Sequence, residues 1–218
     1  MRPPRPASAL LALAALTACS GGMPDLLGTR IPEVALAAYQ RAAEAAPSVS
    51  AGCVVDWEVV AAIGRVESNH GRVDGPRTIE ANGDVVPPIR GLPLDGADGR
   101  EAVPDTDAGE RDGDARWDRA MGPLQFIPTT WDELGRDGNG DGLADPDNLY
   151  DAALTAVAHL CLREPGDYAD RAALRRALVG YNASGRYADE VLDWIDRYRQ
   201  TPVDELVDRP RGTAPSAG

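Results

Sequence analysis

DWEVVAAIGRVESNHGR, residues 56–72, has the apolar spacing of a helix that buries one face. Asp56 is a suitable N-cap for this helix. Val60, Ile63 and Glu67 follow one stripe at i, i+3 and i+7, which places the Glu67 carboxyl group at the buried C-terminal end. Desolvation and the negative end of the helix dipole both disfavour the charged carboxylate, so we predict a raised pKa, which suits a general acid. Taken alone, the stretch also allows a solvated glutamate in the last turn.

Helical spacing continues through most of the chain on both sides of this stretch. It predicts further helices over residues 32–46, 128–134, 151–163, 171–179 and 188–199. Pro47 and Pro165 are expected to stop the first and third of these helices. No alternation of apolar and polar residues predicts a long strand, so the expected fold class is mainly α.

Residues 72–119 interrupt the helical pattern and form an expected insertion. These 48 residues contain seven Gly, five Pro and twelve acidic residues, without a sustained period. A structureless loop of this length is unusual in a compact domain unless it is functional. Apolar residues between Ile79 and Leu94 could form short strands or a folded flap, and we expect a flap over one end of a substrate groove. Residues 200–218 are rich in Pro, Asp and Arg and are expected to form a flexible tail.

The length and charge of the chain restrict its class. Its 218 residues fit one domain, and 35 acidic against 22 basic residues give a net charge of −13. Nucleic-acid phosphates repel such a chain, so we expect no nucleic-acid partner. Two histidines, His70 and His159, make a zinc centre improbable on inventory, and the sequence has no Gly-x-Ser-x-Gly motif. His70 could tune nearby Glu67, although a surface or cap position is the ordinary expectation.

The N-terminus resembles the signal of a bacterial lipoprotein. Two arginines precede an apolar run over residues 7–18, which is too short to span a bilayer but fits a secretory signal. The sequence Leu-Thr-Ala-Cys that ends at Cys19 resembles the lipobox, in which the cysteine is acylated. We expect a signal peptide over 1–18, a tether over 19–30 and an extracytoplasmic chain anchored to the cell membrane through Cys19. An ordinary secretory peptide with an incidental cysteine is the alternative.

Cys53 and Cys161 are the cysteines that remain after Cys19 is assigned to lipidation. An even pair of cysteines in an oxidising compartment predicts a disulfide between them. Two unpaired thiols in the core are the alternative.

Four motifs follow one another along the chain. They are VESNHGR over residues 66–72, GPLQFIPTTW over 122–131, DGNGDGLADPDNLYDA over 137–152 and GYNAS over 180–184. Together they resemble the lytic murein transglycosylases, in particular the B-type branch and its actinobacterial relatives. The resemblance spans residues 31–199 and implies a lysozyme-like (goose-type, SLT) helical domain with a long irregular insertion. Leu124 stands where the family usually has Met, and Thr129 where it usually has Ser.

The resemblance assigns roles to five residues. Glu67 matches the catalytic acid and base, Gln125 matches a residue that contacts substrate, and Tyr181 with Asn182 matches the pair that flanks the acid. Ser68 is expected either to position substrate or to bond to nearby backbone. Tyr181 lies on the apolar face of its predicted helix, so an ordinary core tyrosine is its alternative role.

The reaction that the resemblance implies is cleavage of the β-1,4 bond between N-acetylmuramic acid and N-acetylglucosamine in peptidoglycan. Glu67 alone would act as acid and then as base, leaving a 1,6-anhydro ring without consuming water or using a cofactor. Hydrolysis normally requires a second carboxylate, for which Asp74, Asp114 and Asp118 are the candidates in the insertion. A lysozyme-like muramidase and a catalytically idle peptidoglycan-binding lipoprotein are therefore the alternatives. We expect a monomer.

The loop over residues 137–151 has the ligand spacing of an EF-hand. Positions 1, 3, 5, 7 and 9 are Asp137, Asn139, Asp141, the Leu143 carbonyl group and Asp145. Position 12 is Asn148 instead of Glu, so Asp151 or Asp147 would have to complete a calcium site. We predict a structural Ca²⁺ ion here, with a metal-free Asp/Gly turn as the alternative. A calcium-dependent adhesion module would explain this loop but none of the other motifs.

Overall fold

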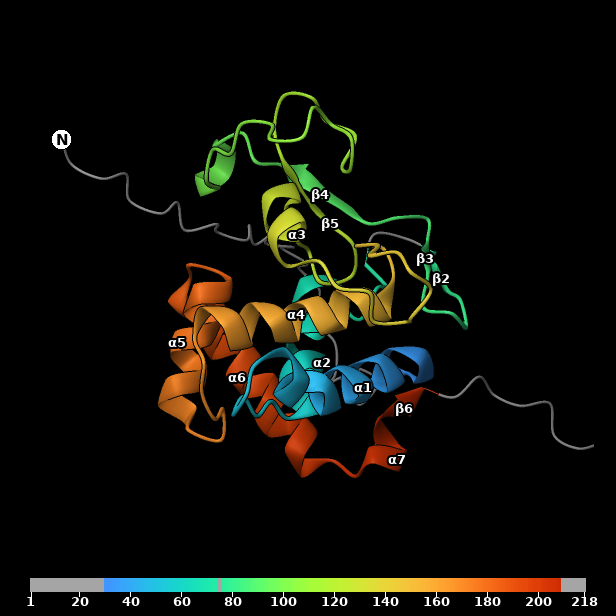
Figure 1. Ribbon diagram of the computed structural model, residues 1–218, viewed down its shortest axis with the longest axis vertical. Helices are drawn as coiled ribbons and strands as arrows, with labels where there is room; N and C mark the ends of the chain where they lie inside the picture. The colour runs from blue at the N-terminus through green and yellow to red at the C-terminus, as the bar shows by residue number, and fades with distance from the viewer. Residues whose placement is uncertain (1–29, 74–75, 209–218) are drawn as a thin grey trace, which may run out of the picture.

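The computed structural model describes residues 30–73 and 76–208 (Figure 1). The expected signal peptide, the predicted lipidation site Cys19 and the candidate acid Asp74 lie outside the described residues. Among the residues that are described, no helix combines the length and apolar character needed to cross a membrane.

The fold is mainly helical, as predicted. The helices are α1 (Glu33–Val49), α2 (Trp57–Ser68), α3 (Pro128–Leu134), α4 (Leu149–Arg163), α5 (Arg171–Tyr181), α6 (Gly185–Gln200), α7 (Val203–Leu206) and the short 3₁₀ helix η1 (Ala97–Gly99). The strands are β1 (Ile31–Pro32), β2 (Thr78–Ile79), β3 (Val85–Val86), β4 (Arg90–Pro93), β5 (Arg119–Met121) and β6 (Val207–Asp208). They form three pairs: β1 with β6 in parallel, and β2 with β3 and β4 with β5 in antiparallel orientation.

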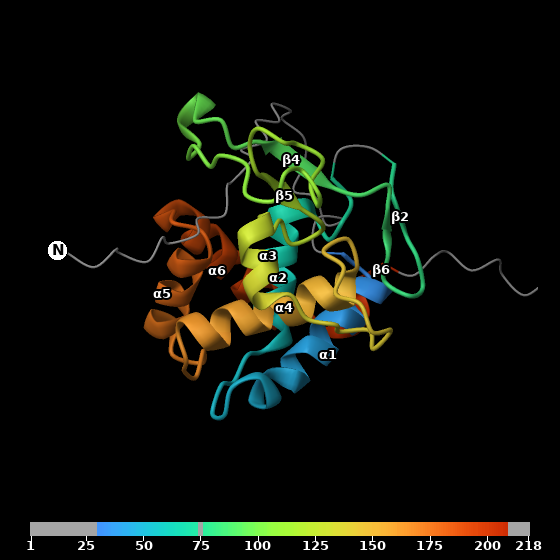
Figure 2. The same cartoon turned by 45° about the horizontal axis from the view of Figure 1, so that its top comes forward.

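Helix α2 lies at the centre of the helical part, in contact with α1, α4 and α6 (Figures 1 and 2). Its residues Val59, Val60 and Ile63 are fully buried. The helix that carries Glu67 is therefore enclosed by the rest of the domain, as its apolar stripe predicts.

Local signals explain where several helices begin. The side chains of Asn148, Asp170 and Ser184 accept hydrogen bonds from backbone N–H groups in the first turns of α4, α5 and α6. Helix α3 begins with Pro128, whose missing N–H is not needed at that position.

Cys53 and Cys161 form the predicted disulfide, with their Cα atoms 5.7 Å apart. The two cysteines are 108 residues apart in sequence, and the bond joins the segment before α2 to the last turn of α4. The alternative of two unpaired thiols is excluded.

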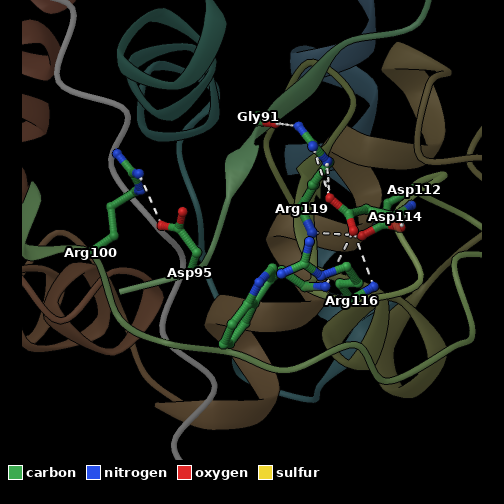
Figure 3. Close-up of polar contacts among 8 residues, drawn as sticks. Gly91, Asp95, Arg100, Asp112, Asp114, Arg116 and Arg119 are labelled. Atoms are coloured by element: carbon green, nitrogen blue, oxygen red, sulfur yellow. Dashed lines mark hydrogen bonds and ion pairs between the residues drawn. The ribbon is translucent and has the colours of Figure 1, made fainter. Parts of the chain in front are cut away.

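The insertion is folded by short strands and polar contacts. It contains β2, β3, β4 and η1, and its β4–β5 part lies on the α3 side of the helices in both views (Figures 1 and 2). The Arg119 side chain donates hydrogen bonds to Asp114 (2.9 Å) and to the Gly91 carbonyl group (3.1 Å), while its backbone N–H donates to Asp112 (2.6 Å) (Figure 3). That the insertion lies over one end of a substrate groove remains a prediction.

Arg90 connects the insertion to the loop over residues 137–151. Its guanidinium group forms two parallel hydrogen bonds with the Asp147 carboxylate, at 2.7 and 2.8 Å. This bidentate geometry is the strongest form of an arginine–carboxylate pair. The insertion is therefore attached to the helical domain at a defined point.

Helices α4, α5 and α6 extend one to three residues beyond their predicted ends, and two other predictions are wrong. Helix α1 continues through Pro47 to Val49, because a proline in the last turn removes one backbone hydrogen bond without disrupting the earlier turns. Residues 201–208 do not form a flexible tail: they contain α7 and β6, Leu206 is fully buried, and Val207 pairs with Ile31. Burial of Leu206 and pairing with β1 stabilise this segment. Residues 209–218 of the expected tail lie outside the described residues.

Candidate functional site

Glu67 lies in the last turn of α2 and is half-buried. Its Oε1 atom is inaccessible and has no hydrogen-bond partner among the described residues. Desolvation raises the pKa of this carboxyl group to about 8, with a further rise from the negative charge of Glu190 and a partial reduction from the Tyr187 hydroxyl group. The desolvated position of this carboxyl group agrees with the predicted rise in pKa and disagrees with the alternative of a solvated glutamate. Near neutral pH, this carboxyl group is therefore protonated in most molecules.

Tyr187 is the residue of this site that the sequence analysis missed. It lies in the first turn of α6 and is fully buried, and its hydroxyl group interacts with the Glu67 carboxyl group without forming a hydrogen bond of ordinary geometry. Its pKa is raised first by desolvation and then by the charge of Glu67, so it stays a neutral phenol. The sequence around Tyr187 shows only an apolar helix position, because its closeness to Glu67 results from the packing of α2 against α6.

Tyr181 and Asn182 lie where α5 ends. The Tyr181 hydroxyl group donates a hydrogen bond to the Leu124 carbonyl group (3.2 Å), and its ring stacks in parallel with Tyr187 at 6.4 Å between centroids. Desolvation, followed by the charge of Glu67, raises the pKa of Tyr181. The Nδ2 atom of buried Asn182 has no hydrogen-bond partner among the described residues. The structure therefore brings Tyr181 close enough to interact with Glu67, and Asn182 follows it as the C-cap of α5.

The Gln125 loop, residues 122–127, has a constrained backbone. Gly122 has a φ of 70°, and a Cβ atom there would lie 1.7 Å from the Pro146 carbonyl oxygen, so glycine is required. Gln125 has a φ of 56°, an uncommon conformation for a residue with a side chain. Its side-chain amide donates to the Gly122 carbonyl group (2.8 Å), while Gly91 leaves space beside its Oε1 atom. Gln125 is buried, so in this conformation its amide binds its own loop.

Ser68 bonds to nearby backbone, which was one of its two expected roles. Its hydroxyl group donates to the Pro123 carbonyl group (2.6 Å) and accepts from the Gly71 N–H (2.7 Å). The side chain is buried and both of its roles are used, so it is not open to a ligand. Ser68 instead joins the end of α2 to the Gln125 loop.

His70 directly follows the C-cap residue Asn69 of α2, which agrees with the expected cap position, but it is not at the surface. It is fully buried between two tyrosines, with Nδ1 at 3.1 Å from the Tyr39 hydroxyl group and Nε2 at 3.0 Å from the Tyr198 hydroxyl group. The second histidine, His159, lies edge-on to Tyr181 at 4.8 Å between ring centroids. Neither histidine is part of a group of three possible metal ligands in the described residues.

The carboxylates of the Asp137 loop, residues 137–151, bind the N–H groups of that loop. Asp137 accepts hydrogen bonds from Gly140 (2.6 Å) and Gly142 (2.8 Å). Asp151 accepts from Gly138 (2.7 Å), Asn139 (3.1 Å) and Asp145 (2.9 Å). The side chains of Asn139 and Asp141 form the next two turns of the loop, and Leu143 is exposed. These bonds explain how the loop folds, and calcium binding there remains a prediction.

The acidic side chains that lie closest together are not those of the predicted calcium site. Over residues 30–73 and 76–208, the one group of three acids whose oxygens lie within 4.8 Å of one another is Asp105, Asp107 and Asp118 in the insertion. Asp118 is fully buried, and both of its oxygens accept hydrogen bonds from the Thr106 hydroxyl group (3.0 and 2.8 Å). No three carboxylates of the Asp137 loop converge to this extent.

The candidate second carboxylates have partners inside the insertion. Asp114 forms an ion pair with Arg119 at 2.8 Å, and the hydrogen bond from Arg119 lowers the pKa of Asp114. Asp118 is held by Thr106. The acid whose charge acts on Glu67 is instead Glu190 of α6, an exposed residue that no sequence motif marked.

Comparisons of the chain with protein-family models, curated proteins and solved structures find no significant match.

Proposed function

We propose that this chain is a peptidoglycan lytic transglycosylase with a lysozyme-like domain, in which Glu67 is the single acid and base. The observation that carries the proposal is the unpartnered, inaccessible Oε1 atom of Glu67 on a carboxyl group whose pKa is raised to about 8. The Tyr187 hydroxyl group of α6 interacts with this carboxyl group without a hydrogen bond of ordinary geometry, and the Asn182 amide at the end of α5 has no partner among the described residues. Buried polar groups without partners are costly, and a polar ligand such as a sugar would satisfy them.

The chemistry that we propose uses the two protonation states of Glu67 in turn. The protonated carboxyl group donates its proton to the glycosidic oxygen while the bond from that oxygen to muramic C1 breaks. The resulting carboxylate accepts the proton of the C6 hydroxyl group, and the C6 oxygen bonds to C1. The ring closure is intramolecular, which gives it a large advantage over attack by bulk water. Glu67 ends protonated, ready for another cycle.

Hydrolysis is the second candidate reaction, and Glu190 is the observation that favours it. A hydrolase that inverts or retains configuration needs a second carboxylate near the scissile bond. Glu190 acts electrostatically on Glu67, whereas Asp114 and Asp118 are bound within the insertion. In a lytic transglycosylase, Glu190 would only raise the pKa of Glu67.

Mass spectrometry of digested peptidoglycan separates the two reactions. We expect muropeptides that end in 1,6-anhydromuramic acid, lighter by one water than hydrolysed products and without a reducing end. Glu67→Gln should release neither product, and Glu190→Gln should still release anhydro products. Predominantly reducing ends that disappear in Glu190→Gln would establish a hydrolase. No release by the wild-type protein would favour an idle binding protein.

We propose further that the protein acts outside the cytoplasm, anchored to the cell membrane through Cys19. The disulfide between Cys53 and Cys161 supports an oxidising compartment, since such bonds are rare in the cytosol. Metabolic labelling with a fatty acid should modify the wild-type protein but not Cys19→Ala. Secretion of both without a lipid would indicate an ordinary signal peptide.

A further inference from the structure

The chain directly after Glu67 has a strained conformation. Asn69, His70 and Gly71 have φ values of 51°, 59° and 81°, so three consecutive residues adopt the left-handed region. Each non-glycine residue in this region costs about 1 kcal/mol or more. Such a conformation persists only where the surrounding structure holds it, so the contacts of this segment decide where α2 ends.

Backbone and side-chain hydrogen bonds hold this segment against α2 and against the Gln125 loop. The N–H groups of Asn69 and His70 donate to the carbonyl groups of Arg65 (3.0 Å) and Gly64 (2.8 Å), which closes the last turn of α2. Ser68 connects this end to the Gln125 loop through Pro123.

The His70 side chain holds this segment against α1 and α6. Its two ring nitrogens lie at hydrogen-bond distance from the hydroxyl groups of Tyr39 on α1 and Tyr198 on α6. All three side chains are buried. The chain of contacts therefore joins α1, the end of α2 and α6, and α6 is also the helix that carries Tyr187.

The sequence of α2 is adapted to this contact. Gly64 lies in the middle of the helix, where glycine costs about 1 kcal/mol relative to alanine. A Cβ atom at that position would lie 2.3 Å from the Tyr39 hydroxyl oxygen. Gly64 thus leaves the space through which the Tyr39 phenol reaches His70.

The surroundings of the His70 ring keep it neutral. Burial and the positive charges of Arg72 and Arg65 all lower its pKa. A neutral imidazole has one donor and one acceptor nitrogen, so one tyrosine donates to it and the other accepts. The arrangement is fully satisfied, in contrast to the unpartnered Oε1 atom of Glu67.

We propose that His70, held between Tyr39 and Tyr198, is the positioning residue that fixes the Glu67 carboxyl group relative to Tyr187 and the Gln125 loop. The inference rests on the proposed function of Glu67. It explains why a strained helix end directly follows the proposed acid: Ser68 attaches that end to the Gln125 loop, and His70 attaches it to α6, the helix that carries Tyr187. Small errors in the position of a catalytic group reduce rates strongly, so such attachment has a direct catalytic effect.

Removal of single hydroxyl groups tests the proposal without creating a large cavity. In Tyr39→Phe and Tyr198→Phe, the imidazole loses one partner while the ring stays in place. We expect kcat to fall by about tenfold or more and KM to stay within about twofold, because a displaced acid affects the transition state more than substrate binding. Tyr168→Phe is the matched control, since the Tyr168 hydroxyl group is also buried and bonds to the Leu160 carbonyl group (2.7 Å) at the far end of α4. It should lose stability but keep kcat.

A second measurement does not depend on the reaction. Titration of the Glu67 carboxyl group, followed by ¹³C NMR with Glu67→Gln to assign the signal, should show a lower midpoint in both tyrosine variants, because a displaced carboxyl group gains access to water. The midpoint should be unchanged in Tyr168→Phe. An unchanged midpoint and kcat in Tyr39→Phe and Tyr198→Phe would overturn the proposal, as would equal losses in Tyr168→Phe. If no variant and no wild-type protein cleaves peptidoglycan, the proposed function fails, whereas the midpoints still decide the role of His70.

Discussion

Replacement of Glu67 by Gln should stabilise the protein, and the gain should grow with pH. The native carboxyl group has a pKa of about 8 against an ordinary value of 4.5, so the folded state binds this proton more tightly than the unfolded state. Its contribution is most favourable below about pH 4.5 and is lost as the pH rises through 8. Glutamine has nearly the same shape and cannot ionise, so it removes this loss.

The size of the effect follows from the two pKa values. The interval between 4.5 and about 8 corresponds to about 5 kcal/mol above pH 8, at 1.36 kcal/mol per pKa unit. Because Glu67 is half-buried and water can relax around the ion, we expect about half of this value. For a domain of this size, about 2 kcal/mol corresponds to a change in Tm of roughly 4–8 °C.

Thermal unfolding of both proteins from pH 5 to pH 8.5 measures this difference. The gain in Tm of Glu67→Gln over wild type should be small at pH 5 and several degrees at pH 8.5. Glu44→Gln, the same chemical change at an exposed position on α1, is the control and should show no such trend. A gain that does not change with pH, or a loss of stability at pH 8.5, would refute the inference that Glu67 is held in a desolvating environment.

Three further predictions concern stability. Replacing Cys53 and Cys161 by alanine should lower the free energy of unfolding by about 2–5 kcal/mol in denaturant titrations, because the disulfide closes a long loop, and an unchanged midpoint would contradict this. Burial lowers the pKa of His159 to about 4 and that of His70 well below 6.5, so the unfolded state takes up protons first, and stability should fall below about pH 6.5 by up to about 1.4 kcal/mol per pH unit for each histidine. His159→Gln should reduce this slope, measured by denaturant unfolding between pH 7 and pH 5. Calcium should raise the Tm of the wild-type protein but not of Asp137→Ala, and the absence of a shift up to millimolar calcium would favour the metal-free turn.

Sequence patterns predicted the parts of the fold that depend on local spacing. The apolar stripe of α2 placed Glu67 at a buried helix end, and α3 and the C-terminal end of α4 lie where their periodicity predicted them. The disulfide followed from the number of cysteines and the expected compartment. These features depend on residues that are close in sequence or on the number of residues of one type, and one sequence provides both.

The remaining features depend on contacts between distant residues. Strands of two to four residues have no measurable period, and β1 pairs with β6 across almost the whole described chain. Glu190 and Tyr187 act on Glu67 because α6 packs against α2. The burial of His70 likewise requires Tyr198, which is 128 residues away. No local signal marks these residues as neighbours of the site.

The parallel pairing of β1 with β6 has a consequence for redesigning the connectivity of the domain. Because Ile31 pairs with Val207 and Pro32 with Asp208, the first and last described segments are neighbouring strands about 5 Å apart. Because the two strands are parallel, a linker from Asp208 back to residue 30 has to reverse direction twice, which takes about a dozen residues. A circular permutant could then begin and end within the insertion, for example after Asp98, whose side chain is 85% exposed. The helices around Glu67 would keep their order in space while the insertion became two separate arms.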